Sequence, residues 1–196
     1  MEINFKNLLK DLFPSITEST QEEIKKAIAQ FGLNPQLLYQ SINKNVIYQG
    51  DIITEIQFVT LIRSNLYRKK TLKGMLISNT CDYENRDTIL IAPVYSFKHI
   101  KRKYKGASFI DSLKKNLIYD KFYLPGYIPN NDAVVDFSGI NSVKKDFLVS
   151  SINNKEIDRI NSFSQMGFYY FITKLTVYFL RRESNEIIRE KHNVIN

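Results

Sequence analysis

The chain has very few of the residues that form disulfide bonds and protein-held zinc sites. It has one cysteine, Cys81, and two histidines among its 196 residues. A disulfide bond needs two thiols, and a structural zinc site uses about four cysteine or histidine ligands. The acidic residues Asp82, Glu84 and Asp87 lack the ligand order and the central glycine of an EF-hand calcium loop. We therefore predict neither a metal ion nor a cofactor.

Long hydrophobic runs are also scarce. The first residues show no apolar stretch that leads to a small-residue cleavage site, so they do not resemble a secretory signal. The segment 163–180 is the most apolar, but it contains Ser164, Gln165, Thr173 and Lys174 and is short for crossing a hydrocarbon layer of roughly 30 Å. A buried amphipathic helix fits it better. We predict a cytoplasmic protein that makes no membrane contact.

Basic residues outnumber acidic ones, and the excess is concentrated in one part of the chain. There are 28 Lys and Arg against 20 Asp and Glu, a formal net charge of +8. Residues 63–121 hold 14 of the basic and five of the acidic side chains, so this segment carries +9 and the rest of the chain −1. Clustered cations attract phosphate backbones because each neutralised phosphate releases condensed counterions. We predict a nucleic-acid partner; the alternative is a pair of exposed loops that lysine keeps soluble.

The candidate nucleic-acid-binding residues lie in the two densest basic clusters of this segment. Tyr67 and Tyr104 lie inside these clusters, where their rings can stack on unpaired bases. We expect the folded chain to gather the cations in one exposed trough. The candidates are Arg63, Arg68, Lys69, Lys70, Lys101, Arg102, Lys103 and Lys105.

Residues 1–41 have the patterns of three helical segments. Thr20 and Glu23 have the spacing of a capping box, and apolar residues follow at positions i, i+3, i+4 and i+7. Asn34 and Pro35 then offer a cap followed by proline at the first helical position. These residues are predicted to form an N-terminal helical cap.

Residues 45–150 have the pattern of a β domain. Short runs rich in β-branched and aromatic residues are bounded by Gly, Asn, Asp and Pro, which is typical of strands and turns. These runs lie at 45–48, 52–62, 74–78, 88–95, 121–124 and 133–137, with a basic helical insertion at about 97–120. The remaining residues, 151–196, are predicted to form C-terminal helices at 155–160 and 163–182 that are integral to the same domain.

Several short stretches resemble the strands of the PemK/MazF-like toxins. They are Gln49-Gly50-Asp51-Ile52-Ile53, Gly74-Met75-Leu76-Ile77-Ser78 and Ile91-Ala92-Pro93-Val94, and the run 131–137 is similar to a later strand of that family. The similarity covers about residues 46–150. It implies an α+β protein with an SH3-like, mostly antiparallel β-barrel, on which the N-terminal helical segment and the C-terminal helices pack.

The resemblance also implies a function. It points to an endoribonuclease that needs no metal ion and acts in a toxin–antitoxin pair. The implied partners are RNA rather than DNA, an antitoxin or another protein, and a second copy in a homodimer. Cleavage of RNA requires proton donors and acceptors beside a cation that stabilises the charged phosphorane. The alternative is a non-catalytic module that binds nucleic acid or protein, as a component of a bacterial phage-defence system.

The predicted catalytic residues are Lys73, Asp82 and Ser96. Lys73 stands where the family has arginine, and lysine keeps the charge but lacks the bidentate fork of the guanidinium. Tyr95 stands at the position of the family's catalytic Thr or Ser, and Ser96 follows it. Asp82 ends the polar string 78–82 and can act as an acid or a base; the alternative is that it makes the hydrogen bonds of a turn.

Overall fold

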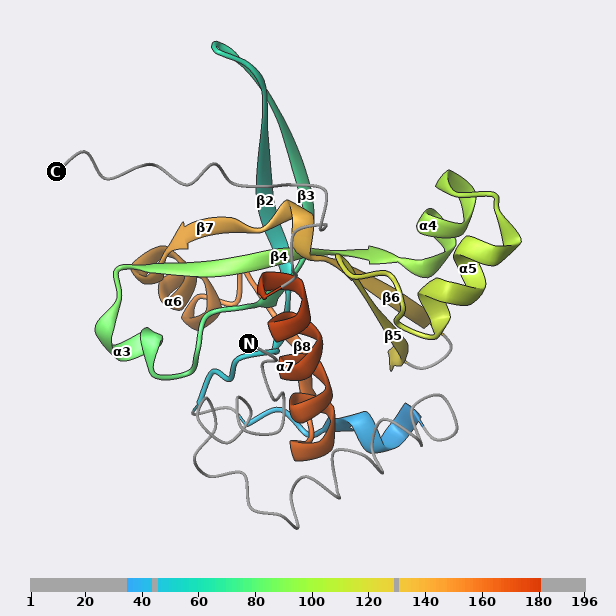
Figure 1. Cartoon of the computed structure of the whole chain (residues 1–196). Coiled ribbons are helices and arrows are strands. Elements are labelled where there is room, and N and C mark those ends of the chain that lie inside the picture. Colours follow the sequence, from blue (N-terminus) through green and yellow to red (C-terminus); the bar gives the residue numbers. More distant parts are fainter. Residues whose placement is uncertain (1–34, 44–45, 129–130, 181–196) are drawn as a thin grey trace, which may run out of the picture.

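The computed structural model describes residues 35–43, 46–128 and 131–180. It is an α+β structure in which one eight-stranded antiparallel sheet is surrounded by helices (Figure 1). Most of the helical cap predicted for residues 1–41 lies outside the described residues. Its last part is described, and the 3₁₀ helix η1 (Pro35–Leu38) begins at the proline where the sequence predicts a helix start. The helix ends there, and Tyr39 and Gln40 form a short strand instead of continuing the predicted cap, because they pair with residues 162 and 163.

The strands follow the order β1-β8-β2-β3-β4-β6-β5, and β7 pairs with the first half of β4. Every pairing is antiparallel. Within the described ranges no pairing joins β1 to β5, so the sheet does not close into a barrel. The strands are β1 (Tyr39–Gln40), β2 (Ile52–Arg63), β3 (Leu66–Leu76), β4 (Thr88–Ser96), β5 (Lys121–Ile128), β6 (Asn131–Asp136), β7 (Asn141–Lys144) and β8 (Arg159–Phe163).

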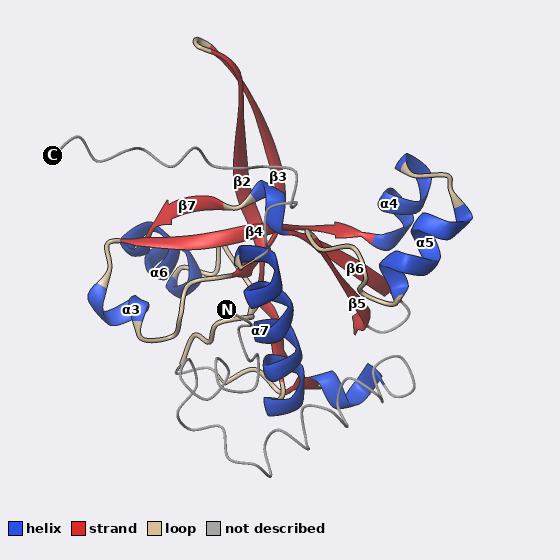
Figure 2. Cartoon of the chain, in the orientation of Figure 1, coloured by secondary structure: helices blue, strands red, loops and turns tan. Residues whose placement is uncertain are grey.

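The helices lie at the ends of β4 and across one face of the sheet (Figure 2). Two of them flank the start of β4 and two follow its end, while the longest packs against the sheet centre. They are α3 (Asp82–Asn85), α4 (Phe97–Lys103), α5 (Ala107–Lys114), α6 (Lys145–Asn153) and α7 (Gln165–Phe179), with a short 3₁₀ helix η2 (Phe137–Gly139). No helix in the described part of the chain is long and apolar enough to cross a membrane.

Three buried clusters hold these elements together. The largest joins the sheet to α7 and contains stacked and tilted rings, among them Phe122, Phe163 and Phe171. A second cluster packs β2, β3 and β4 against α6, and a third places α4 and α5 on β5 and β6. Each fully buried phenylalanine or leucine side chain contributes about 1.5–3 kcal/mol through the apolar surface that it removes from water.

A two-stranded ribbon projects from this body. Strand β3 pairs with β4 only from Lys73 to Leu76, and β2 pairs with β8 only at Ile52 and Ile53. Residues 56–72, which we call the arm, therefore form a hairpin whose outer part leaves the sheet (Figure 1). The sequence predicts a strand at 52–62, which is confirmed. It predicts the next strand only from residue 74, and this start is wrong because β3 begins at Leu66. Pairing with β2 makes this lysine-rich segment a strand.

Two further element predictions are also wrong. The structure has a turn and strand β8 where a helix is predicted at 155–160, and residues 46–48 are a loop where a strand is predicted. Ile157 and Ile160 are spaced three residues apart, which suits a helix, but the backbone of β8 pairs with β1 and β2 instead. By contrast, the helix predicted at 163–182 is confirmed as α7 over Gln165–Phe179, whereas Phe163 belongs to β8 and residues 181–182 lie outside the described residues. The basic helical insertion is confirmed as α4 and α5.

Candidate nucleic-acid interface

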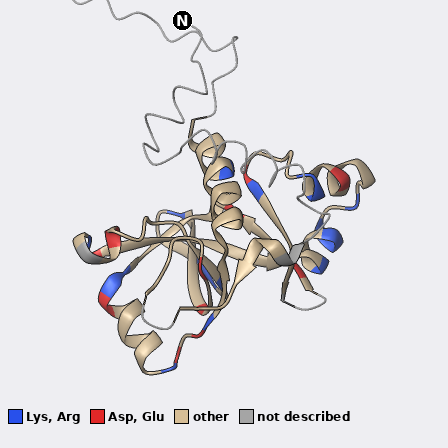
Figure 3. Ribbon diagram, turned by 90° about the horizontal axis from the view of Figure 1, so that it is seen from below, with Lys and Arg blue, Asp and Glu red and all other residues tan. Residues whose placement is uncertain are grey.

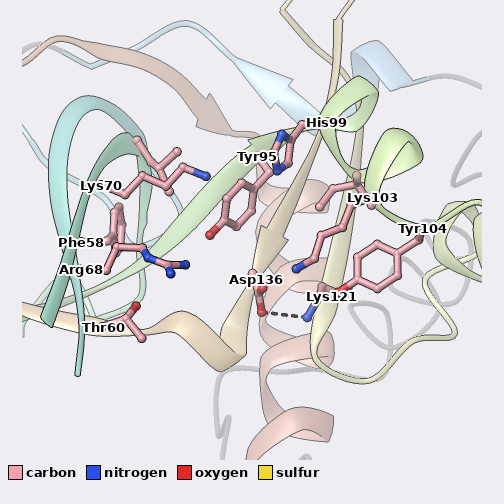
Figure 4. A pocket seen from close by; sticks show the side chains of 12 residues that line it. Phe58, Thr60, Arg68, Lys70, Tyr95, His99, Lys103, Tyr104, Lys121 and Asp136 are labelled. Carbon is pink, nitrogen blue, oxygen red and sulfur yellow. Dashed lines mark hydrogen bonds and ion pairs between the residues drawn. The ribbon is translucent and has the colours of Figure 1, made fainter. Parts of the chain in front are cut away.

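A cavity of about 210 Å³ lies between the base of the arm and helix α4 (Figure 4). The arm forms one wall, α4 forms the other, and residues of β4, β5 and β6 complete the lining. The cavity thus brings together cations from the two basic clusters that are separated in the sequence. Its lining residues are Phe58, Thr60, Arg68, Lys70, Leu72, Tyr95, His99, Ile100, Lys103, Tyr104, Lys121 and Asp136.

Strand alternation selects which arm cations face the cavity. Side chains of a strand point alternately to opposite faces, so Arg68 and Lys70 share one face of β3, and Lys69 lies on the other. In the register of the hairpin, Thr60 stands opposite Arg68 and Phe58 opposite Lys70, and all four residues line the cavity.

Helix α4 supplies the second wall because of how it begins. The Ser96 hydroxyl accepts a hydrogen bond from the backbone N–H of His99 at 3.2 Å, which caps the helix. From that start, His99 and Lys103 are four residues apart and lie on the same face of the helix. Both line the cavity, as does Tyr104, which follows the helix.

Cations and aromatic rings alternate along the cavity wall. The Nζ of Lys70 lies 5.1 Å from the ring centroid of Tyr95, and His99 stacks on the same ring at 5.6 Å and 16°. The Nζ of Lys103 lies 5.1 Å from the ring centroid of Tyr104. Figure 4 shows the Tyr95 hydroxyl directed into the cavity. Burial, helped by the charge of Asp136, raises the pKa of Tyr95, so this hydroxyl remains a hydrogen-bond donor at neutral pH.

Lys121 and Asp136 balance each other at the cavity floor. The buried Lys121 donates hydrogen bonds from its Nζ to Asp120 at 2.5 Å and to Asp136 at 2.9 Å. Burial alone would lower the pKa of Lys121, but these two carboxylates raise it above the ordinary value, so the ammonium stays charged. The four cations and one carboxylate of the lining carry a net charge of +3.

The excess positive charge therefore resides on Arg68, Lys70 and Lys103. No ion pair joins any of the three to a carboxylate in the part of the chain that the structure describes. His99 adds little charge at neutral pH, because burial and the nearby cations Lys70, Arg102 and Lys103 lower its pKa below the usual 6.5. Its neutral ring offers one nitrogen as an acceptor and the other as a donor. The cavity is thus suited to an anion that also carries hydroxyl groups.

The structure does not bring the three predicted catalytic residues together. The Nζ of Lys73 donates to the hydroxyl of Tyr127 at 2.7 Å, and Lys73 lies on the face of β3 opposite Lys70. Asp82 opens α3 and accepts a hydrogen bond from the backbone N–H of Asn79 at 3.2 Å. Ser96 ends β4, whose nine residues span about 26 Å. Asp82 and Ser96 therefore lie at opposite ends of this strand (Figure 1) and cannot serve the same phosphate group.

The other predicted cations divide among several surfaces rather than forming one trough. Arg63 lies at the tip of the arm opposite Leu66, and Lys69 lies on the outer face of the arm. Lys101, Arg102 and Lys105 line two open hollows beside α4 and α5. Figure 3 shows basic residues around α4 and α5 and others at the far end of the molecule, near α3 and α6. The expectation of a single trough is therefore wrong, and the cavity holds only part of the predicted set.

Sequence reasoning missed several residues of the cavity. His99 could have been found from Ser96, because a cap at Ser96 places His99 and Lys103 on one helical face. Tyr95 could have been found from strand alternation. Nothing in the sequence signals the pairing of Lys121 with Asp136, which depends on the register between β5 and β6.

Two comparisons with known proteins, one with family models and one with curated proteins, were made for this chain. No family model matches the chain, and no curated protein matches it. Among the described residues, no group of three or more His, Cys, Asp and Glu side chains is arranged to hold a metal ion. The geometry of the cavity therefore carries the functional proposal.

Proposed function

We propose that this chain binds RNA through the cavity at the base of the arm. The observation that carries the proposal is that Arg68 and Lys70 of β3 line the same cavity as Lys103 of α4, together with the rings of Tyr95 and Tyr104. Three cations that no described carboxylate pairs with attract phosphate, and tyrosine rings stack on bases whose faces are exposed. Unpaired RNA presents both groups at once.

The dimensions and the donors of the cavity favour one nucleotide of an RNA strand. A volume of about 210 Å³ accepts a phosphate group with part of its nucleoside rather than a duplex. The hydroxyl of Tyr95 and the neutral ring of His99 face the same space as the cations, and they can hydrogen bond to a 2′-hydroxyl. The 2′-hydroxyl is the group by which a protein distinguishes RNA from DNA.

We also propose that the fold is related to that of the PemK/MazF-like toxins and derives from an SH3-like barrel that has opened. Strands β2, β3 and β4 form an antiparallel meander, and β6 pairs with the second half of β4, which supports this proposal. The separate pairing of β7 and β6 with the two halves of β4 spreads the sheet instead of closing it.

Binding without cleavage is the form of this function that the geometry favours. Cleavage needs an acid and a base on either side of one phosphate, and Asp82 and Ser96 are separated by the length of β4. Metal-independent cleavage is a second candidate because His99 is neutral at pH 7 and shares the cavity with Lys103. In that reaction its ring would take the proton of the 2′-hydroxyl, and the 2′-oxygen would bond to phosphorus as the bond from phosphorus to the 5′-oxygen breaks. A proton from water would complete the leaving group, so the products would be a 2′,3′-cyclic phosphate and a free 5′-hydroxyl.

The test compares two double variants by fluorescence anisotropy with a labelled oligouridylate of about 16 nucleotides. Removal of the cavity cations in Arg68→Ala/Lys70→Ala weakens binding about 30-fold, since each charged contact contributes about 1 kcal/mol. The matched control, Lys144→Ala/Lys145→Ala, removes the same charge beside α6 and leaves the affinity within about twofold. Equal loss in both variants, or no binding by the unchanged chain, would refute the proposal.

The same mixtures, held in EDTA and run on a denaturing gel, separate binding from cleavage. We expect intact RNA. Fragments that end in a cyclic phosphate and disappear in His99→Gln would establish the second candidate instead.

A further inference from the structure

The outer face of the arm exposes large apolar side chains. Leu61 is 68% exposed, Tyr67 55% and Val59 44%, and all three lie on the face opposite the cavity. Their cross-strand neighbours complete the face: Leu61 stands opposite Tyr67, and Val59 opposite Lys69. Contiguous apolar surface of this kind on a projecting element marks a contact site for a ligand or partner.

A role in stabilising the hairpin does not explain why these apolar side chains are exposed. A cross-strand pair such as Leu61 and Tyr67 stabilises a ribbon only slightly, and a two-stranded ribbon is marginal in water without further packing. Serine, threonine or lysine would serve the strands at these positions without exposing so much apolar surface. We therefore expect a ligand to cover this face.

The charge of the arm selects the occupant. Residues 56–72 contain four cations and no acidic residue. Two arms of this charge repel each other, which disfavours a second copy of the chain as the partner. A polyanion is attracted, and the aromatic ring of Tyr67 has Lys69 beside it, with the Nζ 5.4 Å from the ring centroid. A ring with an adjacent cation is suited to a base and its phosphate.

A ligand can reach the outer face from the cavity by passing around one edge of β3. Tyr67 and Lys69 alternate along β3 with Arg68 and Lys70, so the two faces are the two sides of one strand. Strand β4 pairs with β3 only from Lys73 onward, so no described strand pairs with the edge of β3 from Leu66 to Leu72 on that side. A flexible strand of nucleic acid can pass around this edge, whereas a duplex cannot.

We infer that the outer face of the arm is a stacking platform for unpaired bases, so that one RNA strand runs from the cavity around the edge of β3 and onto Tyr67 and Leu61. This inference rests on the proposed function and narrows its ligand to single-stranded RNA longer than the cavity alone can hold. Bases in a duplex are already stacked on each other, so their faces are not free to stack on the platform.

The experiment uses the full chain, Tyr67→Ala, and two labelled oligouridylates of about 4 and about 16 nucleotides. The longer strand reaches the platform, so Tyr67→Ala weakens its binding about tenfold. The shorter strand occupies the cavity only, and its affinity stays within about twofold. The slope of affinity against salt is unchanged, because a neutral ring releases no counterions. The control Phe147→Ala removes an exposed ring of α6 and changes neither affinity.

The outcomes separate this inference from the proposed function. If the unchanged chain binds neither oligonucleotide, the proposed function fails. If it binds both and Tyr67→Ala binds them equally well, the cavity proposal stands and the platform is refuted. The platform is also refuted if a duplex of about 16 base pairs binds as tightly as the single strand. A dimer that Tyr67→Ala dissociates in sedimentation, with RNA affinity unchanged, would identify a second copy as the occupant. Melting curves establish that each variant is folded.

Discussion

Lys174 connects α7 to the segment between α5 and β5. It lies inside the protein, 8% exposed, and its Nζ donates to the backbone carbonyls of Asn116 at 2.8 Å and Ile118 at 2.6 Å. These two bonds tie the helix to the segment between α5 and β5. Burial lowers the pKa of Lys174 to about 8, against a smaller opposing effect of Asp120.

This pKa predicts a pH dependence of stability with a definite sign. The unfolded lysine titrates at 10.5, so between pH 8 and 10.5 the unfolded chain binds more protons than the folded one. The free energy of unfolding therefore rises with pH in this window. We expect an increase of about 1–2 kcal/mol from about pH 7.5 to about pH 9.5, measured by urea denaturation. Lys174→Met abolishes the increase, and Lys98→Met, at an exposed position, retains it. An increase that persists in Lys174→Met would contradict the assignment.

At this scale the sequence predicted residue types better than residue roles. The cations of the cavity were all among its candidates, except for Lys121. Ser96 was predicted as an acid or base because it follows Tyr95, which stands at the family's catalytic Thr or Ser position, whereas the structure uses its hydroxyl as a helix cap. Lys73 was separated from Lys70 by three positions, an odd number, which in a strand means opposite faces.

Some helices and strands follow from the local sequence pattern, whereas others form only because distant strands pair with them. Strand β4 was predictable because it is a short run rich in β-branched and aromatic residues, and helix α7 because its apolar residues repeat with the helical period. The first half of β3 was not, since its string of basic residues has no apolar alternation and becomes a strand only through β2. Strand β8 likewise depends on partners that are more than 100 residues distant.

Gly167 shows how closely α7 and η1 fit together. A Cβ at this position would overlap the backbone carbonyl oxygen of Leu38 and press on the ring of Phe163. Alanine favours a helix over glycine by about 1 kcal/mol, but the backbone of η1 would have to move. We expect Gly167→Ala to lower the free energy of unfolding by about 2–3 kcal/mol in urea denaturation. Gly106→Ala is the control, because its nearest atom lies at 3.9 Å. Equal effects in both variants would disprove the close contact.

The whole molecule carries +8. If the chain binds RNA as we propose, the distribution of that charge, rather than its sum, decides how the strand is held. Most cations of segment 63–121 lie either on a path that joins the cavity to the arm or in the hollows beside α4 and α5. A ligand drawn by net charge alone would contact both regions. A strand that follows the cavity and the arm contacts only the first, and the number of released counterions distinguishes the two cases.

Salt dependence measures that number for the intact chain. Five cations lie on the path through the cavity and the arm: Arg63, Arg68, Lys69, Lys70 and Lys103. Each phosphate contact of a single strand contributes about −0.7 to the slope of the logarithm of the binding constant against the logarithm of the salt concentration. The unchanged chain should therefore give a slope of about −3.5. Arg68→Ala/Lys70→Ala brings it to about −2, whereas Lys101→Ala/Arg102→Ala/Lys105→Ala leaves it near −3.5. A slope that falls in proportion to the charge removed, in both variants, would mean that RNA is attracted by the whole basic surface and that no defined path exists.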